Sequence, residues 1–250
     1  MDGTMKITFL GTSHGVPAAD RYCSSTMIEV NGSLYFIDAG APLIDILLRR
    51  GVDLNKVRAI FTTHIHGDHT NGIPALADLF SWYFKTTSVD IYMTEQQGID
   101  TFKAMIRTVE GGLDEARVRF RLMTADTVYE DENIRLTPFP TQHMAAAGRP
   151  AYSYLLEAEG KKALFSGDLS QHLAKGDFPA FALNNDVDLM VCEMAHFGVD
   201  HVKPYLEKCR AKTLLFNHVF PLHKLDEINA LNGAFGYPIR TVDDGDEVTL

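Results

Sequence analysis

The sequence predicts an α/β protein with mixed β-sheets. Short β-prone runs stand together in two parts of the chain, and in each part strand-like and helix-like segments then alternate. This order suggests two facing sheets with helices outside, although periodicity alone supports only a mixed α/β fold. Of the 250 residues, 46% are hydrophobic, which is enough to bury a large core.

The first half of the chain begins with strands and then alternates. Its predicted strands cover residues 5–10, 26–30, 34–38, 57–62 and 89–93. Its predicted helices cover residues 41–50, 73–84 and 96–108. Pro74 supports the start of the second of these helices, because proline is tolerated in the first turn.

The second half follows a similar order. Its predicted strands cover residues 118–122, 126–129, 134–140, 151–158, 161–166, 188–192, 213–216 and 238–242. Its predicted helices cover residues 177–183, 202–211 and 223–233.

A dense cluster of metal-ligand side chains follows the predicted strand at residues 57–62. His64, His66, Asp68 and His69 lie within six positions, although the whole chain has only ten histidines. Imidazole and carboxylate are ligands that borderline divalent metals prefer. Four such groups do not easily share one small ion, so we expect two adjacent ions on this strand-to-helix loop. The alternative is a polar turn that happens to be rich in histidine.

The cluster resembles the signature of the metallo-β-lactamase superfamily of binuclear metal hydrolases. The resemblance implies an αββα sandwich, in which two facing mixed sheets are flanked by helices. It also implies further ligands downstream, and His143, Asp168 and His218 follow β-prone runs in the expected order. Asp38 resembles the family's supporting aspartate, which would orient a ligand histidine. Taken singly, each of these residues could be an ordinary turn or strand-end residue.

The resemblance also divides the ligands between two ions. The first ion would be held by His64, His66 and His143, the second by Asp68, His69 and His218, and Asp168 would bridge both. Five histidines and two aspartates without a thiolate fit two divalent ions. We expect Zn²⁺, with Mn²⁺ or Fe as alternatives.

Other short words resemble the ribonuclease Z and cyclic phosphodiesterase branch of the superfamily. They cover residues 10–17, 21–25, 63–74, 166–168 and 188–195. The resemblance implies that Asp68 binds metal and orients a metal-bound hydroxide, while His201, steered by Glu193, assists the leaving group. His196, three residues after Glu193, is the competing candidate for this role, although its place beside Phe197 is more typical of a packing residue. His14, in a glycine-rich turn, is a candidate substrate contact or an exposed loop histidine.

The substrate is expected to be small. Ribonuclease Z carries a long arm for transfer RNA between the segments that match His143 and Asp168, but here these residues are only 25 positions apart. The net charge is −10 and no basic stripe stands out, so nucleic acid is not expected as a partner. These features favour a phosphodiesterase that acts on a cyclic phosphate or nucleotide. The alternatives are a carboxyl-ester, thioester or lactone hydrolase with the same metals and, less favoured, a tRNA 3′-processing endonuclease or a metal sensor.

Composition agrees with a single domain over residues 1–250, although length alone also allows two, and the resemblance implies that this domain is a metallo-hydrolase. No linker or low-complexity stretch interrupts the chain, and no apolar run approaches the roughly 18 residues of a membrane helix. The N-terminus lacks a secretory pattern, and the scattered Cys23, Cys192 and Cys209 fit reduced thiols. We therefore expect a cytoplasmic enzyme without a membrane partner, and the resemblance suggests a homodimer.

Overall fold

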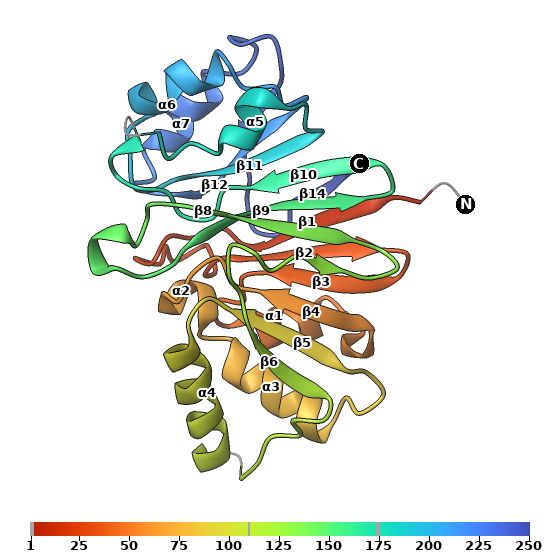
Figure 1. Ribbon diagram of the computed structural model, residues 1–250. Helices are drawn as coiled ribbons and strands as arrows, with labels where there is room; N and C mark the ends of the chain where they lie inside the picture. The colour runs from red at the N-terminus through yellow and green to blue at the C-terminus, as the bar shows by residue number, and fades with distance from the viewer. Residues whose placement is uncertain (1–2, 110, 174–175) are drawn as a thin grey trace.

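The computed structural model describes residues 3–109, 111–173 and 176–250. Within these residues, two seven-stranded sheets face each other and helices cover their outer faces (Figure 1). The predicted αββα sandwich is therefore confirmed. None of the helices in the described ranges combines the length and the apolar character that crossing a membrane requires.

The first sheet joins the N-terminal strands to the last strand of the chain. Its order is β14-β1-β2-β3-β4-β5-β6. Its strands are β1 (Met5–Gly11), β2 (Ser25–Val30), β3 (Ser33–Ile37), β4 (Val57–Phe61), β5 (Val89–Met93), β6 (Val118–Leu122) and β14 (Glu247–Thr249). Neighbours from β14 to β3 are antiparallel, and those from β3 to β6 are parallel. Its outer face carries α1 (Leu43–Arg49), α3 (Ile73–Trp82) and α4 (Gln96–Val109).

The second sheet has the order β13-β12-β11-β10-β9-β8-β7. Its strands are β7 (Tyr129–Glu130), β8 (Arg135–Pro140), β9 (Tyr152–Ala158), β10 (Lys161–Phe165), β11 (Leu189–Met194), β12 (Leu214–Val219) and β13 (Ile239–Thr241). Neighbours from β7 to β10 are antiparallel, and those from β10 to β13 are parallel. Its outer face carries α5 (Ala180–Asn184), α6 (Val199–Leu206) and α7 (Lys224–Asn229) (Figure 1).

The central core lies between the two sheets. Alternate side chains point inward, so Phe9 of β1 and Tyr35 of β3 are in the same buried cluster as Tyr154 of β9 and Leu215 of β12. All four are fully buried, and removing such apolar surface from water is the main stabilising contribution to the sandwich. Two further clusters lie under the outer helices. The core thereby fixes the strand ends from which the ligand-bearing loops leave.

Several predicted boundaries are wrong. The predicted helix at 202–211 ends at Leu206, the one at 223–233 ends at Asn229, and the strand at 126–129 is reduced to Tyr129–Glu130. Cys209 and Leu231 are buried in turns that follow the two helices, so their apolar character imitates a longer helix. The short helix α2 (Gly67–Thr70) and the edge strand β14 were not predicted.

Candidate metal centre

The ligand-bearing loops come from both sheets. The loop after β4 carries His64 and His66, and α2 follows at once with Asp68 and His69. From the second sheet come His143 after β8, Asp168 after β10 and His218 within β12. The structure thus brings together all seven residues that the sequence singled out as ligands.

Four of these side chains form a first group. Their potential ligand atoms all lie within 4.8 Å of one another, in His64, His66, His143 and Asp168. His66 Nδ1 lies 2.9 Å from His64 Nε2 and 3.3 Å from His143 Nε2. Asp168 Oδ2 lies 3.7 Å from Nε2 of both His64 and His143.

The second group consists of Asp68, His69 and His218. Asp68 Oδ2 lies 3.4 Å from His69 Nε2 and 3.7 Å from His218 Nε2. Asp168 Oδ2 also faces this group, at 3.6 Å from His69 Nε2 and 3.5 Å from His218 Nε2. One oxygen of Asp168 therefore faces both groups, which is the arrangement expected of a bridging ligand.

The donor set fits two divalent cations. Nε2 of His69 and Nε2 of His218 are buried and lack a hydrogen-bond partner among the described residues, which is costly unless a ligand such as a metal ion satisfies them. Burial lowers the pKa of His64, His66 and His143, and a neutral imidazole is the form that binds metal. The set of imidazoles and carboxylates matches zinc or a similar metal.

The charges around Asp168 also favour bound cations. Burial alone would raise the pKa of Asp168, but the imidazoles of His218, His69 and His64 hold it well below its usual range. Burial alone would lower the pKa of His69, but Asp38 and Asp168 raise it well above its usual range. Positive charge is therefore favoured at His69, and a metal ion at Nε2 can supply it in place of a proton.

Asp38 supports the second group from behind. Its carboxylate lies 2.7 Å from His69 Nδ1 and accepts hydrogen bonds from the backbone N–H of Thr63 (2.7 Å) and its hydroxyl. This contact holds the proton of His69 on Nδ1 and leaves Nε2 free for a ligand. Asp38 has φ +60° and His218 has φ +54°, a backbone region that non-glycine residues seldom adopt.

Glu193 is paired with His196, so the prediction that it steers His201 is wrong. Glu193 Oε1 lies 2.8 Å from His196 Nδ1, and His196 Nε2 lies 3.8 Å from Asp168 Oδ2. His201 is exposed in α6, and its Nδ1 accepts a hydrogen bond from the backbone N–H of Gly198. The chain turns immediately after β11, which returns position 196 to the carboxylate, while α6 carries position 201 away.

The environment of His196 favours its protonated form. Burial alone would lower its pKa, but the hydrogen bond and charge of Glu193 raise it to about 9. The sequence signal for this pair was the spacing of three residues between Glu193 and His196 in a turn after a strand.

His14 lies at the edge of the same cluster. Its ring stacks on Phe220 with centroids 4.7 Å apart, and its centroid is 5.3 Å from that of His218 and 5.7 Å from that of His196. Its Nδ1 accepts a hydrogen bond from the backbone N–H of Val16. The first loop therefore brings a half-buried imidazole to the metal centre.

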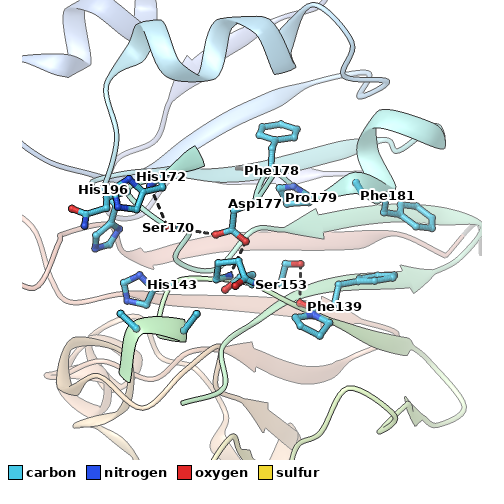
Figure 2. Close-up of a pocket in the computed structure, with 18 of the residues that line it drawn as sticks. Phe139, His143, Ser153, Ser170, His172, Asp177, Phe178, Pro179, Phe181 and His196 are labelled. Carbon is cyan, nitrogen blue, oxygen red and sulfur yellow. Dashed lines mark hydrogen bonds between the residues drawn. The ribbon is translucent and has the colours of Figure 1, made fainter. Parts of the chain in front are cut away.

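A cavity of about 860 Å³ adjoins the first group. Figure 2 shows His143 and His196 at one end and the rings of Phe139 and Phe181 at the other. Asp177 ties its walls together by accepting hydrogen bonds from the backbone N–H groups of Gln142 (2.7 Å) and Ser170 (2.6 Å). No sequence pattern indicated this cavity, because its walls come from separate loops.

Comparison with known proteins identifies relatives of this fold and sequence. Ribonuclease Z of Synechococcus sp. (strain CC9311) is 30% identical over 185 residues, which cover 71% of this chain and 57% of that protein. The chain thus spans less than two thirds of the length of that relative. The metallo-β-lactamase fold protein YhfI of Bacillus subtilis has a TM-score of 0.78 at 18% identity, with 99% of each chain covered. The short form of human tRNase Z has a TM-score of 0.72 at 18% identity, with 97% of this chain and 98% of that chain covered.

The sequence also matches the family model for the Anti-Pycsar protein Apyc1 over residues 5–226. That segment includes every candidate metal ligand. The chain has the metallo-β-lactamase fold, is similar in sequence to ribonuclease Z, and belongs to the Anti-Pycsar protein Apyc1 family.

Proposed function

We propose that the chain is a metal-dependent phosphodiesterase that hydrolyses a small phosphodiester, of the cyclic phosphate or nucleotide type. The observation that carries this proposal is the orientation of His196. Its Nδ1 is hydrogen-bonded to Glu193, and its Nε2 faces the oxygen of Asp168 that both ligand groups share. A proton donor fixed beside a binuclear site is what the departure of an alkoxide from phosphorus requires.

The metal ligands have separate roles in this proposal. The first group and the second group would each hold one ion, with Asp168 between them. When bound, the two ions supply an activated water and stabilise the charge of the phosphoryl oxygens. Asp68, whose Oδ2 lies beside His69 and His218, orients the attacking water.

The leaving group departs with a proton from His196. The attacking water loses one proton to solvent as its oxygen forms a bond to phosphorus, and the bond between phosphorus and the leaving oxygen breaks. His196 gives the proton on Nε2 to that oxygen. It keeps the proton on Nδ1, which donates a hydrogen bond to Glu193. A phosphomonoester and an alcohol result, or one phosphomonoester when the substrate is cyclic. Solvent then returns the proton to His196.

The cavity and the charge support a small substrate. The volume of about 860 Å³ is in the range of small-molecule sites, and the cavity opens directly from His143 and His196. The negative net charge disfavours a long polyanion. RNA is nevertheless a second candidate, because the curated relative is named ribonuclease Z. The expectation that nucleic acid is not a partner is therefore unsupported, and an RNA substrate belongs in the test.

The test compares substrates on metal-loaded protein. We expect hydrolysis of bis(p-nitrophenyl) phosphate and of cyclic nucleotides, and little or no cleavage of a tRNA precursor. Asp68→Ala should abolish turnover and His196→Ala should reduce it by about 10²-fold or more. His201→Ala is the matched control, because this exposed histidine lies outside the cluster. Turnover of a p-nitrophenyl carboxyl ester, a thioester or a lactone with inert phosphodiesters would overturn the proposal, and cleavage of RNA alone would establish the second candidate.

A further inference from the structure

We propose that Lys224 of α7 is a positioning residue for His196, whose backbone turn it holds against the metal centre. This inference rests on the proposed function, because it assigns the proton transfer to His196. Lys224 lies 28 positions after His196 in the sequence and belongs to a different element.

The ammonium group of Lys224 contacts three carbonyl oxygens of one turn. Nζ donates hydrogen bonds to the oxygens of Met194 (3.0 Å), Ala195 (3.2 Å) and Phe197 (2.7 Å). These are the residues on either side of His196. An ammonium group has three N–H donors, so the three carbonyls can use all of them.

Burial makes this contact unusual for lysine. Lys224 is only 9% exposed, whereas a lysine on a surface helix normally extends its amine into water. Among the described residues, no ion pair includes its amine, and the carboxylates of Glu193 and Glu227 act on it only from beyond ion-pair distance. A buried charge without a counter-ion is costly unless strong hydrogen bonds replace its hydration. The three carbonyls accept these hydrogen bonds. We therefore infer that the buried amine of Lys224 stabilises the backbone turn that contains His196.

Glu193 holds the same turn from the other side. Its carboxylate accepts hydrogen bonds from the backbone N–H groups of Ala195 (2.6 Å) and His196 (3.2 Å), in addition to His196 Nδ1. It also accepts from the backbone N–H of Leu169, next to Asp168. The N–H groups of the turn thus point to a buried carboxylate and its carbonyls point to a buried ammonium. Because both the N–H groups and the carbonyls of the turn are held, the imidazole of His196 is fixed with Nε2 toward Asp168.

The consequence is specific to the leaving group. Without the ammonium, the carbonyls of Ala195 and Phe197 lose their donor, and that of Met194 keeps only the backbone N–H of Phe220 at 3.5 Å. The turn can then relax toward solvent or toward other donors. The metal ligands are on other loops and keep their places. Activation of water should therefore persist, while protonation of the leaving oxygen becomes less effective. Substrates with a good leaving group need little protonation of the leaving oxygen, so their kcat should change little.

The test uses metal-loaded protein and a series of methyl aryl phosphodiesters that differ only in the phenol released. Lys224→Met removes the donors at similar side-chain length, and Lys224→Arg restores a cation. Lys203→Met is the matched control, since Lys203 is an exposed lysine on α6 that pairs with exposed Asp200. We expect Lys224→Met to lower kcat by about tenfold or more for phenol release but less than about twofold for p-nitrophenol release, with KM little changed. Lys224→Arg should recover part of the loss.

Deuterium exchange gives a second readout that does not need turnover. We expect Lys224→Met to increase exchange in the peptide spanning residues 193–198, without an increase in peptides that carry the metal ligands. Equal loss for every phenol, or unchanged exchange at 193–198, would overturn the positioning role. A wild-type protein that cleaves no phosphodiester, together with raised exchange at 193–198 in Lys224→Met, would refute the proposed function and leave the contact with the His196 turn intact.

Discussion

Asp38 shows how a single carboxylate can determine metal binding without touching the metal. It lies against His69 Nδ1 and the backbone N–H of Thr63. Asp38→Ala should lower metal content from about two ions per chain toward about one, because His69 loses the partner that orients it. Activity should fall by about 10- to 100-fold. Elemental analysis after gel filtration measures the content, and an unchanged ratio would contradict the role of Asp38.

The candidate ligands could be predicted because one ordered motif carries a family resemblance, and the resemblance indicated the downstream ligands. His64 to His69 form an ordered motif, and His143 and His218 follow apolar runs. The pairing of Glu193 could not be predicted as well, since His196 and His201 are both close in sequence and only the turn after β11 selects between them. Lys224 gave no signal, because a lysine at the start of a helix is ordinary until its amine is seen to be buried.

The C-terminal segment holds the loop that carries His14. Asp244 accepts hydrogen bonds from the backbone N–H of Thr12 (2.8 Å), its hydroxyl (2.7 Å) and the backbone N–H of Tyr22 (2.6 Å). Asp244→Ala should lower the free energy of unfolding by about 1.5–3 kcal/mol, since these groups bond to a charged acceptor. It should also raise KM more than it lowers kcat, because His14 lies at the edge of the site.

The neighbouring aspartate provides the control for this loop. Asp243 pairs with Arg21, whose side chain is largely buried, but the carboxylate of Asp243 is exposed, so solvent screens the pair and limits its contribution to about 1 kcal/mol. Urea denaturation of Asp243→Ala and Asp244→Ala should therefore separate the two effects. Equal destabilisation by both variants would show that Asp244 does not hold the loop by its hydrogen bonds.

A polar contact between the two sheets predicts a dependence on pH. Asp131 accepts hydrogen bonds from the hydroxyls of Tyr35 (2.7 Å) in β3 and Tyr129 (2.8 Å) in β7. Partial burial would raise the pKa of Asp131, but the hydrogen bonds from Tyr35, from the backbone N–H groups of Ile134 and Asn133, and from Tyr129 lower it. Because the folded pKa is lowered, the stabilisation is complete above the unfolded value of about 4 and is lost as pH falls through the folded value.

Asp131→Asn tests this dependence. The variant should be less stable than the wild type by about 1–2 kcal/mol at pH 7, and the difference should shrink as the pH falls below about 4. Urea denaturation of both proteins at the same series of pH values measures the difference directly. A difference that stays constant from pH 7 to pH 3 would exclude a role for the charge of Asp131.

Edge elements were harder to predict than central ones. Central strands such as β4 and β12 are almost entirely buried, so their apolar runs are unmistakable. β14 has only β1 as a neighbour, and Glu247 and Thr249 are exposed, so its sequence resembles a polar tail. Only the family resemblance indicated that the two sheets pack face to face, because packing of one sheet on another leaves no periodicity in the sequence.

Substrate specificity depends on how the whole molecule packs, so sequence patterns could predict only that the substrate is small. Phe139 of β8 and Phe181 of α5 are 42 positions apart, yet their rings lie 5.7 Å apart at the end of the cavity. The metal ligands, in contrast, are indicated by one ordered motif and by the family resemblance that it carries. The reaction class therefore follows from local motifs, whereas the shape of the site depends on how distant loops pack.

Metal removal should destabilise the whole sandwich. His64 to His69 leave the first sheet, while His143, Asp168 and His218 leave the second, so bound ions connect the two sheets. Without ions, Nε2 of His69 and Nε2 of His218 are buried and have no hydrogen-bond partner in the part of the chain that the structure describes. A metal at 100 times its dissociation constant stabilises the folded state by about 2.7 kcal/mol per site.

Chelation followed by reconstitution measures this contribution. We expect the melting temperature to fall by several degrees after chelation and to recover when about two equivalents of Zn²⁺ or Mn²⁺ are restored. His218→Ala should show a smaller response to chelation than the wild type, since it removes one ligand of the second group, whereas His201→Ala should respond like the wild type. A protein that binds no metal after reconstitution, with a melting temperature indifferent to chelator, would contradict the metal centre itself and every role derived from it.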